Sequence, residues 1–282
     1  MNLFITGSNG YLAKNLINRL SKKKNIKIFA LTRKKNNTLK KNVKWLVGPI
    51  DKEWPELKKS DILIHLAAEG VRGLYSNYKK CYNFNVTKSK KLVLNAYKSG
   101  CKKWLIVTSC KEKKIGSIKK YQNNLKKYEK IPFFNYGLTK KIFTEFCINF
   151  SKQKKVKCRI FRLFQIYGGN EPKKRLWPSL LEAIKGNKNL TISHGEQKQD
   201  FCNIRFLLDE LEKSLNFSFK KKNFPQIWDL ATGKSVSVKN FIKLFWKKFN
   251  SKKEILISNK KDYDNYDYYV NKKILWKVKS EI

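Results

Sequence analysis

A tyrosine and a lysine four residues apart are the first candidates for chemistry. The segment FFNYGLTKKIF holds Tyr136 and Lys140, and this spacing places both side chains on one face of a helix. A tyrosine hydroxyl has an unperturbed pKa of about 10, and a nearby ammonium group lowers that pKa because it stabilises the phenolate. We therefore predict that Tyr136 exchanges a proton with an alcohol oxygen near neutral pH.

A serine upstream can act on the same oxygen. The apolar run WLIVT ends in Ser109, and α/β sheets place their ligands at the carboxyl ends of their strands. Its hydroxyl can donate to a carbonyl or accept from the hydroxyl that is turned over. The tyrosine–lysine pair alone is weak evidence among 13 tyrosines and 57 lysines. The interpretation of this pair as catalytic depends on its position in the sequence after Ser109 and after a glycine-rich turn.

That turn is TGSNGYLA, residues 6–13. Gly7 and Gly10 follow an apolar run and precede a helical pattern, which is the context of a dinucleotide-binding turn. The first glycine allows a tight turn, the second lets the backbone approach a pyrophosphate, and the helix start favours negative charge. Ala13 occupies the third position, where helix–strand packing needs a small side chain. A G-x-x-G alone is also compatible with an ordinary strand–turn–helix.

The end of the second apolar run bears on which dinucleotide binds. IKIFAL is followed by Thr32, Arg33, Lys34 and Lys35, with no acidic residue to bind the hydroxyls of an adenine ribose. Arg33 and its neighbouring lysines can instead bind a 2′-phosphate. We therefore predict NADP in preference to NAD.

The elements that must position these residues follow from hydrophobic periodicity. Strands separated by helices predict βαβ units and a doubly wound parallel sheet of the Rossmann type, and apolar runs such as DILIHLAA predict strands covered on both faces. The expected strands are Leu3–Thr6, Ile26–Leu31, Lys44–Leu46, Ile62–Leu66, Trp104–Thr108 and Lys157–Leu163, and the expected helices are Leu12–Ser21, Asn83–Ser99 and Tyr136–Lys152.

Beyond Gly168–Gly169 the pattern becomes less regular. We expect an NAD(P)-binding domain over residues 1–168 and a smaller mixed α/β substrate-binding region over 169–282, of which about 203–235 returns to the main sheet. The expected strands are Leu190–Ser193, Ile227–Leu230 and Glu254–Ile257, and the expected helices are Leu180–Lys185, Phe206–Asn216 and Val238–Phe249.

The formal net charge of +43 suggests nucleic acid as a partner, but the composition argues against it. Only seven basic residues are arginine, the preferred residue for phosphate and base-edge recognition, and the lysines are spread along the whole chain. The six cysteines form no C-x-x-C pair, and the two histidines are too few for a zinc pattern. With no apolar run long enough to span a membrane and no signal-peptide pattern, we expect a cytoplasmic protein with reduced thiols.

Seven elements, in order, resemble the extended short-chain dehydrogenase/reductases, and in particular their sugar-nucleotide epimerase/dehydratase/reductase group. TGSNGYLA resembles the family's TGxxGxxG, VTS the strand that ends in the catalytic serine or threonine, and YGLTK the YxxxK element. HLAA, FNV, FRLFQIYGG and GEQKQDFCNI resemble four further family segments. The resemblance implies a Rossmann domain, a small sugar-nucleotide domain, a nicotinamide cofactor and a homodimer built on the helices that carry Asn85 and Tyr136.

Departures from the family pattern narrow the expected reaction. Cys110 and Lys111 replace the Asp-Glu pair with which the family's 4,6-dehydratases remove water, so we do not expect dehydration. Pro49 replaces the aspartate of the family's G-D-I, which leaves Ile50 to pack on the adenine. Gln165 and Gln199 replace an asparagine and an arginine that contact the nucleotide sugar. Arg175 or Arg205 is a candidate for the missing phosphate contact.

We therefore expect an NAD(P)-dependent oxidoreductase acting on a nucleotide-activated sugar. Our preferred reaction is reduction of a 4-keto-6-deoxysugar, as in the CDP-abequose and CDP-paratose synthases that this chain resembles. The alternatives are a 4-epimerase with tightly bound NAD, and a non-catalytic nucleotide- or RNA-binding protein on the same scaffold.

The resemblance assigns roles residue by residue. The catalytic residues are Ser109, Tyr136 and Lys140. The cofactor-binding residues are Gly7, Asn9, Gly10, Tyr11, Leu12, Thr32, Arg33, Ile50, Leu66, Ala67, Ala68, Asn85, Thr108, Tyr136, Lys140 and Phe164. The substrate-binding residues are Ser109, Gln165, Arg175 and Arg205, and no metal site is expected.

Overall fold

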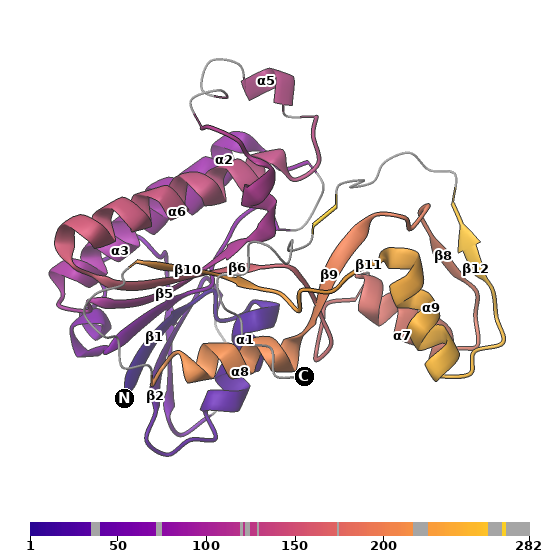
Figure 1. The fold of residues 1–282 in the computed structure, drawn as a ribbon. Coiled ribbons are helices and arrows are strands. Elements are labelled where there is room, and N and C mark those ends of the chain that lie inside the picture. The colour runs from indigo at the N-terminus through magenta and orange to yellow at the C-terminus, as the bar shows by residue number, and fades with distance from the viewer. Residues whose placement is uncertain are drawn as a thin grey trace. The chain divides into compact units, whose positions relative to one another are not determined.

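The fold is that of a computed structural model (Figure 1). It describes residues 1–34, 40–71, 75–118, 121, 125–128, 130–173, 175–216, 225–258 and 267–268. Lys35, which we included among the residues near the 2′-phosphate, lies outside these ranges. The chain divides into two compact units, one comprising 1–162 with 208–228 and the other 163–207 with 229–282.

A seven-stranded sheet with the order β10-β6-β5-β4-β1-β2-β3 organises the first unit. Its strands are β1 (Asn2–Thr6), β2 (Lys27–Thr32), β3 (Val43–Val47), β4 (Ile62–His65), β5 (Lys103–Ser109), β6 (Lys157–Leu163) and β10 (Gln226–Leu230). The five strands from β5 to β3 pair in parallel, with Thr6 opposite both Leu31 and His65. Their carboxyl ends therefore share one edge, which is where a doubly wound sheet binds its ligands.

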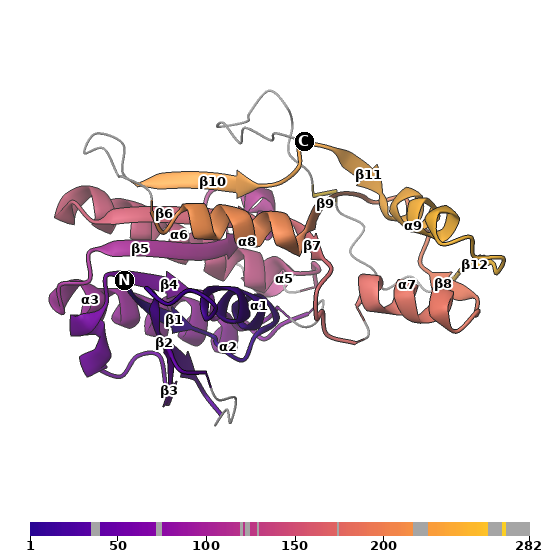
Figure 2. The ribbon, with the colours of Figure 1, turned by 90° about the horizontal axis from the view of Figure 1, so that it is seen from below.

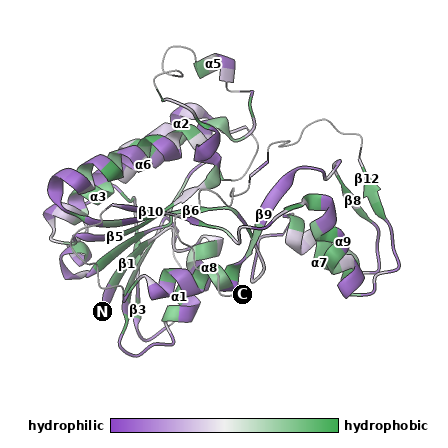
Figure 3. Ribbon diagram, in the orientation of Figure 1, coloured by the Kyte–Doolittle hydropathy of each residue, from purple (hydrophilic) through white to green (hydrophobic). Residues whose placement is uncertain are grey.

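Helices cover both faces of this sheet (Figures 1 and 2). On one face lie α2 (Tyr78–Tyr82), α3 (Ser89–Lys98) and α6 (Phe134–Lys154), and on the other lie α1 (Tyr11–Leu20) and α8 (Ile204–Lys213). In Figure 3 the strands around β1 are hydrophobic, whereas the helices alternate between hydrophilic and hydrophobic segments. This is the pattern of a parallel sheet buried between amphipathic helices.

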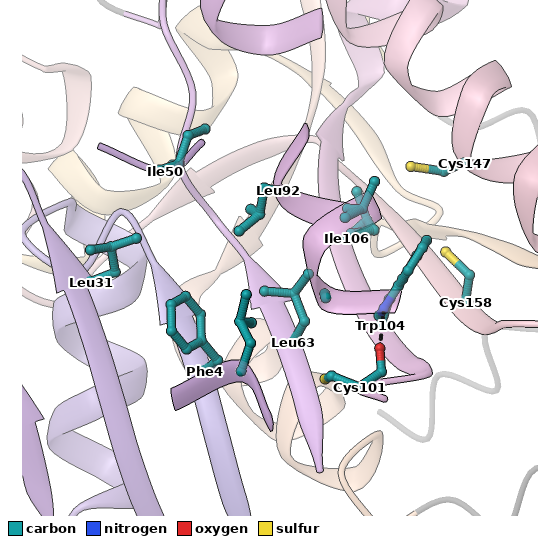
Figure 4. Packing of buried hydrophobic residues seen from close by; sticks show 14 of the residues in the cluster. Phe4, Leu31, Ile50, Leu63, Leu92, Cys101, Trp104, Ile106, Cys147 and Cys158 are labelled. Carbon is teal, nitrogen blue, oxygen red and sulfur yellow. Dashed lines mark hydrogen bonds between the residues drawn. The ribbon is translucent and has the colours of Figure 1, made fainter. Parts of the chain in front are cut away.

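The main core lies between the sheet and helices α3 and α6. Phe4, Leu63 and Trp104 contribute from three neighbouring strands and are fully buried (Figure 4). Leu92 of α3 and Cys147 of α6 pack on the same cluster. The indole of Trp104 also donates a hydrogen bond of 2.7 Å to the carbonyl of Cys101, so its polar atom is satisfied inside the core.

The second unit is built on two small sheets. β7 (Gln165–Tyr167), β9 (Lys198–Asn203) and β11 (Ser235–Ser237) form one, with the order β11-β9-β7, and β8 (Leu190–Ile192) pairs with β12 (Ile255–Ile257) in the other. Helices α7 (Leu176–Lys185) and α9 (Val238–Lys248) accompany them. Phe201 and Phe241 stack with ring centroids 3.8 Å apart at the centre of this unit's apolar cluster.

The predicted α/β class and all nine predicted strands are confirmed, with ends that differ by at most a few residues. Two features differ from the sequence prediction. One is a set of unpredicted elements, namely the strands β7, β9 and β11 and the short helices η1 (Pro55–Lys59), α2, η3 (Cys110–Lys114) and α5 (Leu125–Tyr128). The other is the helix expected over 83–99, which is a π-helical turn, η2 (Asn83–Lys88), followed by α3. Among the described residues, no helix is both long and apolar enough to cross a membrane. All six cysteines lie within the described residues, where they are buried and form no disulfide.

Candidate active site

The glycine turn after β1 is packed against the loop after β4. Gly7 has a φ of +72°, and a Cβ atom there would lie 2.8 Å from the backbone nitrogen and Cα of Ala67. Gly10 donates from its amide to the Gly7 carbonyl at 2.7 Å and is the N-cap of α1. Ala13 is buried beneath the turn. The turn therefore requires glycine at position 7 for its backbone angle and for its close approach to HLAA.

The residues after β2 are arranged beside this turn. The Asn9 side chain donates to the Thr32 hydroxyl at 2.7 Å and to the Lys34 carbonyl at 3.2 Å. Arg33 is exposed, and its guanidinium lies 3.8 Å from the Glu69 carboxylate and 5.9 Å from the centre of the Phe84 ring. Thr32 is thus a buried structural hydroxyl, and Arg33 faces a carboxylate that the sequence did not indicate.

A buried histidine joins the first strand to the helical layer. The Thr6 hydroxyl and the His65 Nδ1 atom lie 2.7 Å apart, and the His65 Nε2 atom lies 3.0 Å from the Ser89 hydroxyl. Burial, and then the charge of Lys140, lower the pKa of His65 to about 3, so the imidazole is neutral. His65 therefore acts as a structural link between β1, β4 and the start of α3.

Asn85 connects three segments from within the π-helical turn. Its amide group accepts from the Glu69 backbone amide at 2.8 Å and donates to the Glu69 carbonyl at 2.9 Å. It also donates to the Thr139 hydroxyl of α6 at 3.1 Å. Asn85 is 1% exposed. A π-turn commonly marks a functional segment, and here it aims one amide at both α6 and the loop after β4.

Ser109, Tyr136 and Lys140 meet at the carboxyl end of β5. Ser109 is the last residue of β5, and its hydroxyl accepts from the Lys111 amide at 3.2 Å and is hydrogen-bonded to Tyr136. Lys140 donates from Nζ to the Val107 carbonyl at 2.8 Å and is 2% exposed. The structure therefore brings the three predicted catalytic residues together, although Lys140 is directed at the backbone of β5.

The prediction that the pKa of Tyr136 lies below its usual value is wrong for this structure. Burial raises the pKa of Tyr136 well above its usual value, and Cys110 and Glu112 add to the rise, while the hydrogen bond from Ser109 opposes it. Burial also lowers the pKa of Lys140 to about 8. The sequence pattern showed which face the two residues share, but it could not show how deeply both are buried.

Glu112 is a charged residue beside this site that sequence reasoning missed. It lies in η3 (Cys110–Lys114), is 4% exposed, and accepts from the hydroxyls of Thr108 and Thr144, each at 2.9 Å. The Nε atom of Arg162 lies 3.7 Å from its other oxygen. Thr108, predicted to bind the cofactor, thus directs its hydroxyl to Glu112. The run KEKK is typical of a solvated segment and carries no signal for a buried carboxylate.

The remaining predicted cofactor contacts differ in burial. Ile50 is 4% exposed and belongs to the main core, and Ala67 and Phe164 are also buried. The partly exposed or exposed members are Asn9, Gly10, Tyr11, Leu12, Leu66 and Ala68. These residues lie on the glycine turn and the HLAA segment, whose closeness the Gly7–Ala67 contact establishes.

The predicted substrate-binding residues Gln165, Arg175 and Arg205 belong to the second unit. Gln165 begins β7 and pairs in register with Phe201 of β9. Arg175 precedes α7, and its Nε atom lies 3.3 Å from the Glu171 carboxylate. Arg205 is exposed in the first turn of α8. The structure brings Gln165 close to Phe201 and engages Arg175 with a carboxylate, and their roles in binding substrate stay predictions.

The residues at the sheet edge fit a dinucleotide. Gly7 and Gly10 let the backbone pack tightly in the turn, where a Cβ would meet other backbone atoms at 2.8–3.0 Å, and the first turn of α1 directs its positive dipole end to this turn. The candidate proton-transfer residues occupy the end of β5, two strands away across the sheet. The fold and this edge define a Rossmann-type enzyme.

Comparison with known proteins gives the family. The model of the NAD dependent epimerase/dehydratase family matches residues 3–208, and the chain belongs to this family, whose members are enzymes. The resemblance to extended short-chain dehydrogenase/reductases is thereby confirmed. A comparison with curated protein sequences gave no match.

Several solved structures share the fold at low sequence identity. UDP-glucose 4-epimerase from Thermotoga maritima, with UDP-glucose, has 17% identity and a TM-score of 0.75, with 97% of this chain and 91% of that chain covered. UDP-N-acetylglucosamine 4-epimerase from Methanobrevibacter ruminantium, in complex with UDP-N-acetylmuramic acid, has 17% identity and a TM-score of 0.76, with coverage of 96% and 90%. UDP-glucuronic acid 4-epimerase from Bacillus cereus, in complex with UDP-glucuronic acid and NAD, has 19% identity and a TM-score of 0.73, with coverage of 97% and 91%.

Proposed function

We propose that this enzyme transfers hydride between a nicotinamide cofactor and C4 of a nucleotide-activated sugar. The observation that carries the proposal is the meeting of Ser109, Tyr136 and Lys140 at the end of β5. This set lies on the same sheet edge as the Gly7–Gly10 turn. In this proposal the first unit binds the dinucleotide, and Gln165, Arg175 and Arg205 of the second unit are the candidates for binding the nucleotide sugar.

The chain's own residues carry out the proton transfer. A bound nicotinamide supplies or accepts hydride at the sugar carbon. In the reducing direction the Tyr136 hydroxyl donates its proton to the new alkoxide, and the Ser109 hydroxyl donates a hydrogen bond to the same oxygen. The Lys140 ammonium stabilises the tyrosinate that remains. A high pKa for Tyr136 keeps the hydroxyl protonated and ready to act as the acid at neutral pH.

Reduction of a 4-keto-6-deoxysugar with NADPH is the specific reaction that we propose. Arg33 at the end of β2 and the absence of an acidic residue at positions 32–34 support a 2′-phosphate. Cys110 and Lys111 after Ser109 leave no acid–base pair there for dehydration.

A 4-epimerase is the second candidate. It is favoured by the family description and by the fold shared with three 4-epimerases, one of them in complex with NAD. The same residues would oxidise C4 and then reduce it from the other face, with no net use of cofactor. The pairing of Arg33 with Glu69 also weakens the case for a 2′-phosphate.

The test begins with mass measurement of any cofactor that co-purifies with the full-length protein. Turnover is then measured on CDP-, dTDP-, UDP- and GDP-linked 4-keto sugars with NADPH and NADH. A reductase consumes reduced cofactor in step with product, whereas tightly bound NAD with no consumption identifies the epimerase. Tyr136→Phe should lower turnover by at least about 100-fold, and full activity in that variant would overturn the catalytic assignment.

A homodimer is proposed on the outer face of α2 and α6. Tyr78, Tyr82, Leu138 and Ile142 line a cavity of about 420 Å³ there, which a second subunit could cover. The molar mass in solution, measured by light scattering, tests this proposal.

A further inference from the structure

Glu112 is a buried carboxylate to which the proposed reaction assigns no role. Its two oxygens are held by the hydroxyls of Thr108 and Thr144 at 2.9 Å and by Arg162 at 3.7 Å. Only 4% of the residue is exposed. Burying a carboxylate costs several kcal/mol unless charges and hydrogen bonds compensate it, so its place in the fold calls for an explanation.

Both threonines lie close in the chain to the two residues of the Lys140–Val107 hydrogen bond. Thr108 follows Val107, whose carbonyl accepts from Lys140 at 2.8 Å. Thr144 lies one helical turn after Lys140 on the same face of α6. The carboxylate is therefore fixed by the same short stretches of β5 and α6 that fix the ammonium group.

Lys140 needs a negative charge nearby in order to keep its proton. Lys140 is 2% exposed, and burial favours the neutral form of an amine that has no counter-charge. The groups that interact with it are the Val107 carbonyl of β5, neutral His65 of β4, Cys147 of α6 and Glu112 of η3. Glu112 is the carboxylate among them.

We propose that Glu112 is a positioning residue that keeps Lys140 protonated within the protein interior. The proposal rests on the proposed roles of Lys140 and Tyr136, because the charge on Lys140 matters only if it stabilises the tyrosinate. Glu112 acts through Lys140 and does not itself contact the sugar oxygen.

Burial disfavours the charged forms of both Lys140 and Glu112, and the attraction between the two charges opposes both pKa shifts. Burial lowers the pKa of Lys140 to about 8, and the nearby Glu112 carboxylate opposes that fall. Burial raises the pKa of Glu112, whereas Arg162, the two threonine hydroxyls and Lys140 all oppose the rise. Glu112 also raises the pKa of Tyr136. Removing the Glu112 charge should therefore lower the pKa values of both Lys140 and Tyr136.

The test is a titration of Lys140 in the full chain by NMR, with ¹³C-labelled lysine and with Lys140→Arg to assign its signal. Glu112→Gln keeps the size of the side chain and removes its charge. Thr144→Val is the matched control, because it removes one hydrogen bond and leaves the charge. We expect the pKa of Lys140 to fall by about one unit in Glu112→Gln and to stay unchanged in Thr144→Val.

Three results would overturn the proposal. They are an unchanged pKa of Lys140 in Glu112→Gln, an equal fall in both variants, and a protonated Glu112 at neutral pH in the wild-type protein labelled with ¹³C-glutamate. The last measurement decides the question even if Glu112→Gln does not fold. None of these titrations needs a substrate, so failure of the proposed sugar reaction would be seen separately. Where turnover is found, the whole pH profile of kcat/KM should move to lower pH in Glu112→Gln only.

Discussion

The ammonium group of Lys140 in α6 donates a hydrogen bond of 2.8 Å to the carbonyl of Val107, two residues before the end of β5. This hydrogen bond ties the helix that carries Tyr136 to the strand that carries Ser109. A charged donor bonded to a backbone acceptor in the interior is a strong contact. It fixes the register of α6 along β5, and so the distance between the two hydroxyls is set by the scaffold before any ligand binds.

The first prediction concerns the contact between Gly7 and Ala67. Gly7→Ala should lower the free energy of unfolding by more than the roughly 1–2 kcal/mol expected for a residue at positive φ, because the new Cβ would lie 2.8 Å from backbone atoms. Dinucleotide binding, measured by calorimetry, should be lost.

Gly100→Ala is the matched control for that variant. Gly100 also has a positive φ, of +86°, but a Cβ atom there would have no neighbouring atom within 4 Å. It should show the backbone cost alone and bind dinucleotide normally. Equal losses of stability in the two variants would refute the role given to the Ala67 contact.

Much of the scaffold could be predicted because its signal is local. Apolar runs on consecutive positions identified the buried strands, and Gly7 and Gly10 marked the turn between β1 and α1. β7, β9 and β11 were missed because QIY and SVS are too short, and KQDFCN too polar, to give a strand signal. Their pairing depends on residues distant in sequence, such as Gln165 with Phe201.

The second prediction concerns the choice between NADP and NAD. Arg33→Gln should weaken binding of NADPH by roughly 10- to 150-fold, because a guanidinium–phosphate contact is worth roughly 1.5–3 kcal/mol, and should leave NADH binding nearly unchanged. Glu69→Gln should strengthen the binding of NADPH, because it removes the carboxylate that lies 3.8 Å from Arg33. Fluorescence titration with each reduced cofactor measures both effects.

Lys34→Gln serves as the control for general charge. It removes one positive charge beside Arg33 from an exposed side chain. If it weakens NADPH as much as Arg33→Gln does, the preference comes from the overall field of this basic chain and Arg33 has no specific role.

The third prediction concerns Asn85. Asn85→Ala should lower the free energy of unfolding by about 1–3 kcal/mol, because it leaves buried polar partners at Glu69 and Thr139 without their hydrogen bonds. Urea unfolding measures the change. Asn95→Ala is the comparison, since Asn95 is also buried but makes a hydrogen bond of 3.5 Å to the Lys52 carbonyl. A larger loss at Asn95 would contradict the linking role of Asn85.

The chemistry of the site was harder to read from sequence than its location. Spacing placed Tyr136 and Lys140 on one helix face, but their pKa values depend on burial, which arises from β5, η3 and α6 together. The burial of Glu112 could not be predicted either, because three of its four nearest neighbours in the chain are lysines and one is Cys110. A run of that composition indicates a surface until a 3₁₀ turn directs one side chain inward.

The order of the strands has a consequence for synthesis of the chain. β6 ends at Leu163, yet its outer neighbour β10 begins only at Gln226. While the chain emerges from a ribosome, β6 is an edge strand with unpaired backbone groups until more than sixty further residues have been made. During that interval the unpaired edge of β6 can associate with a strand edge of another chain. Arg159 of β6 also gains Gln226 of β10 as a hydrogen-bond acceptor only then, so synthesis of β10 ends the stage of translation at which this edge is exposed.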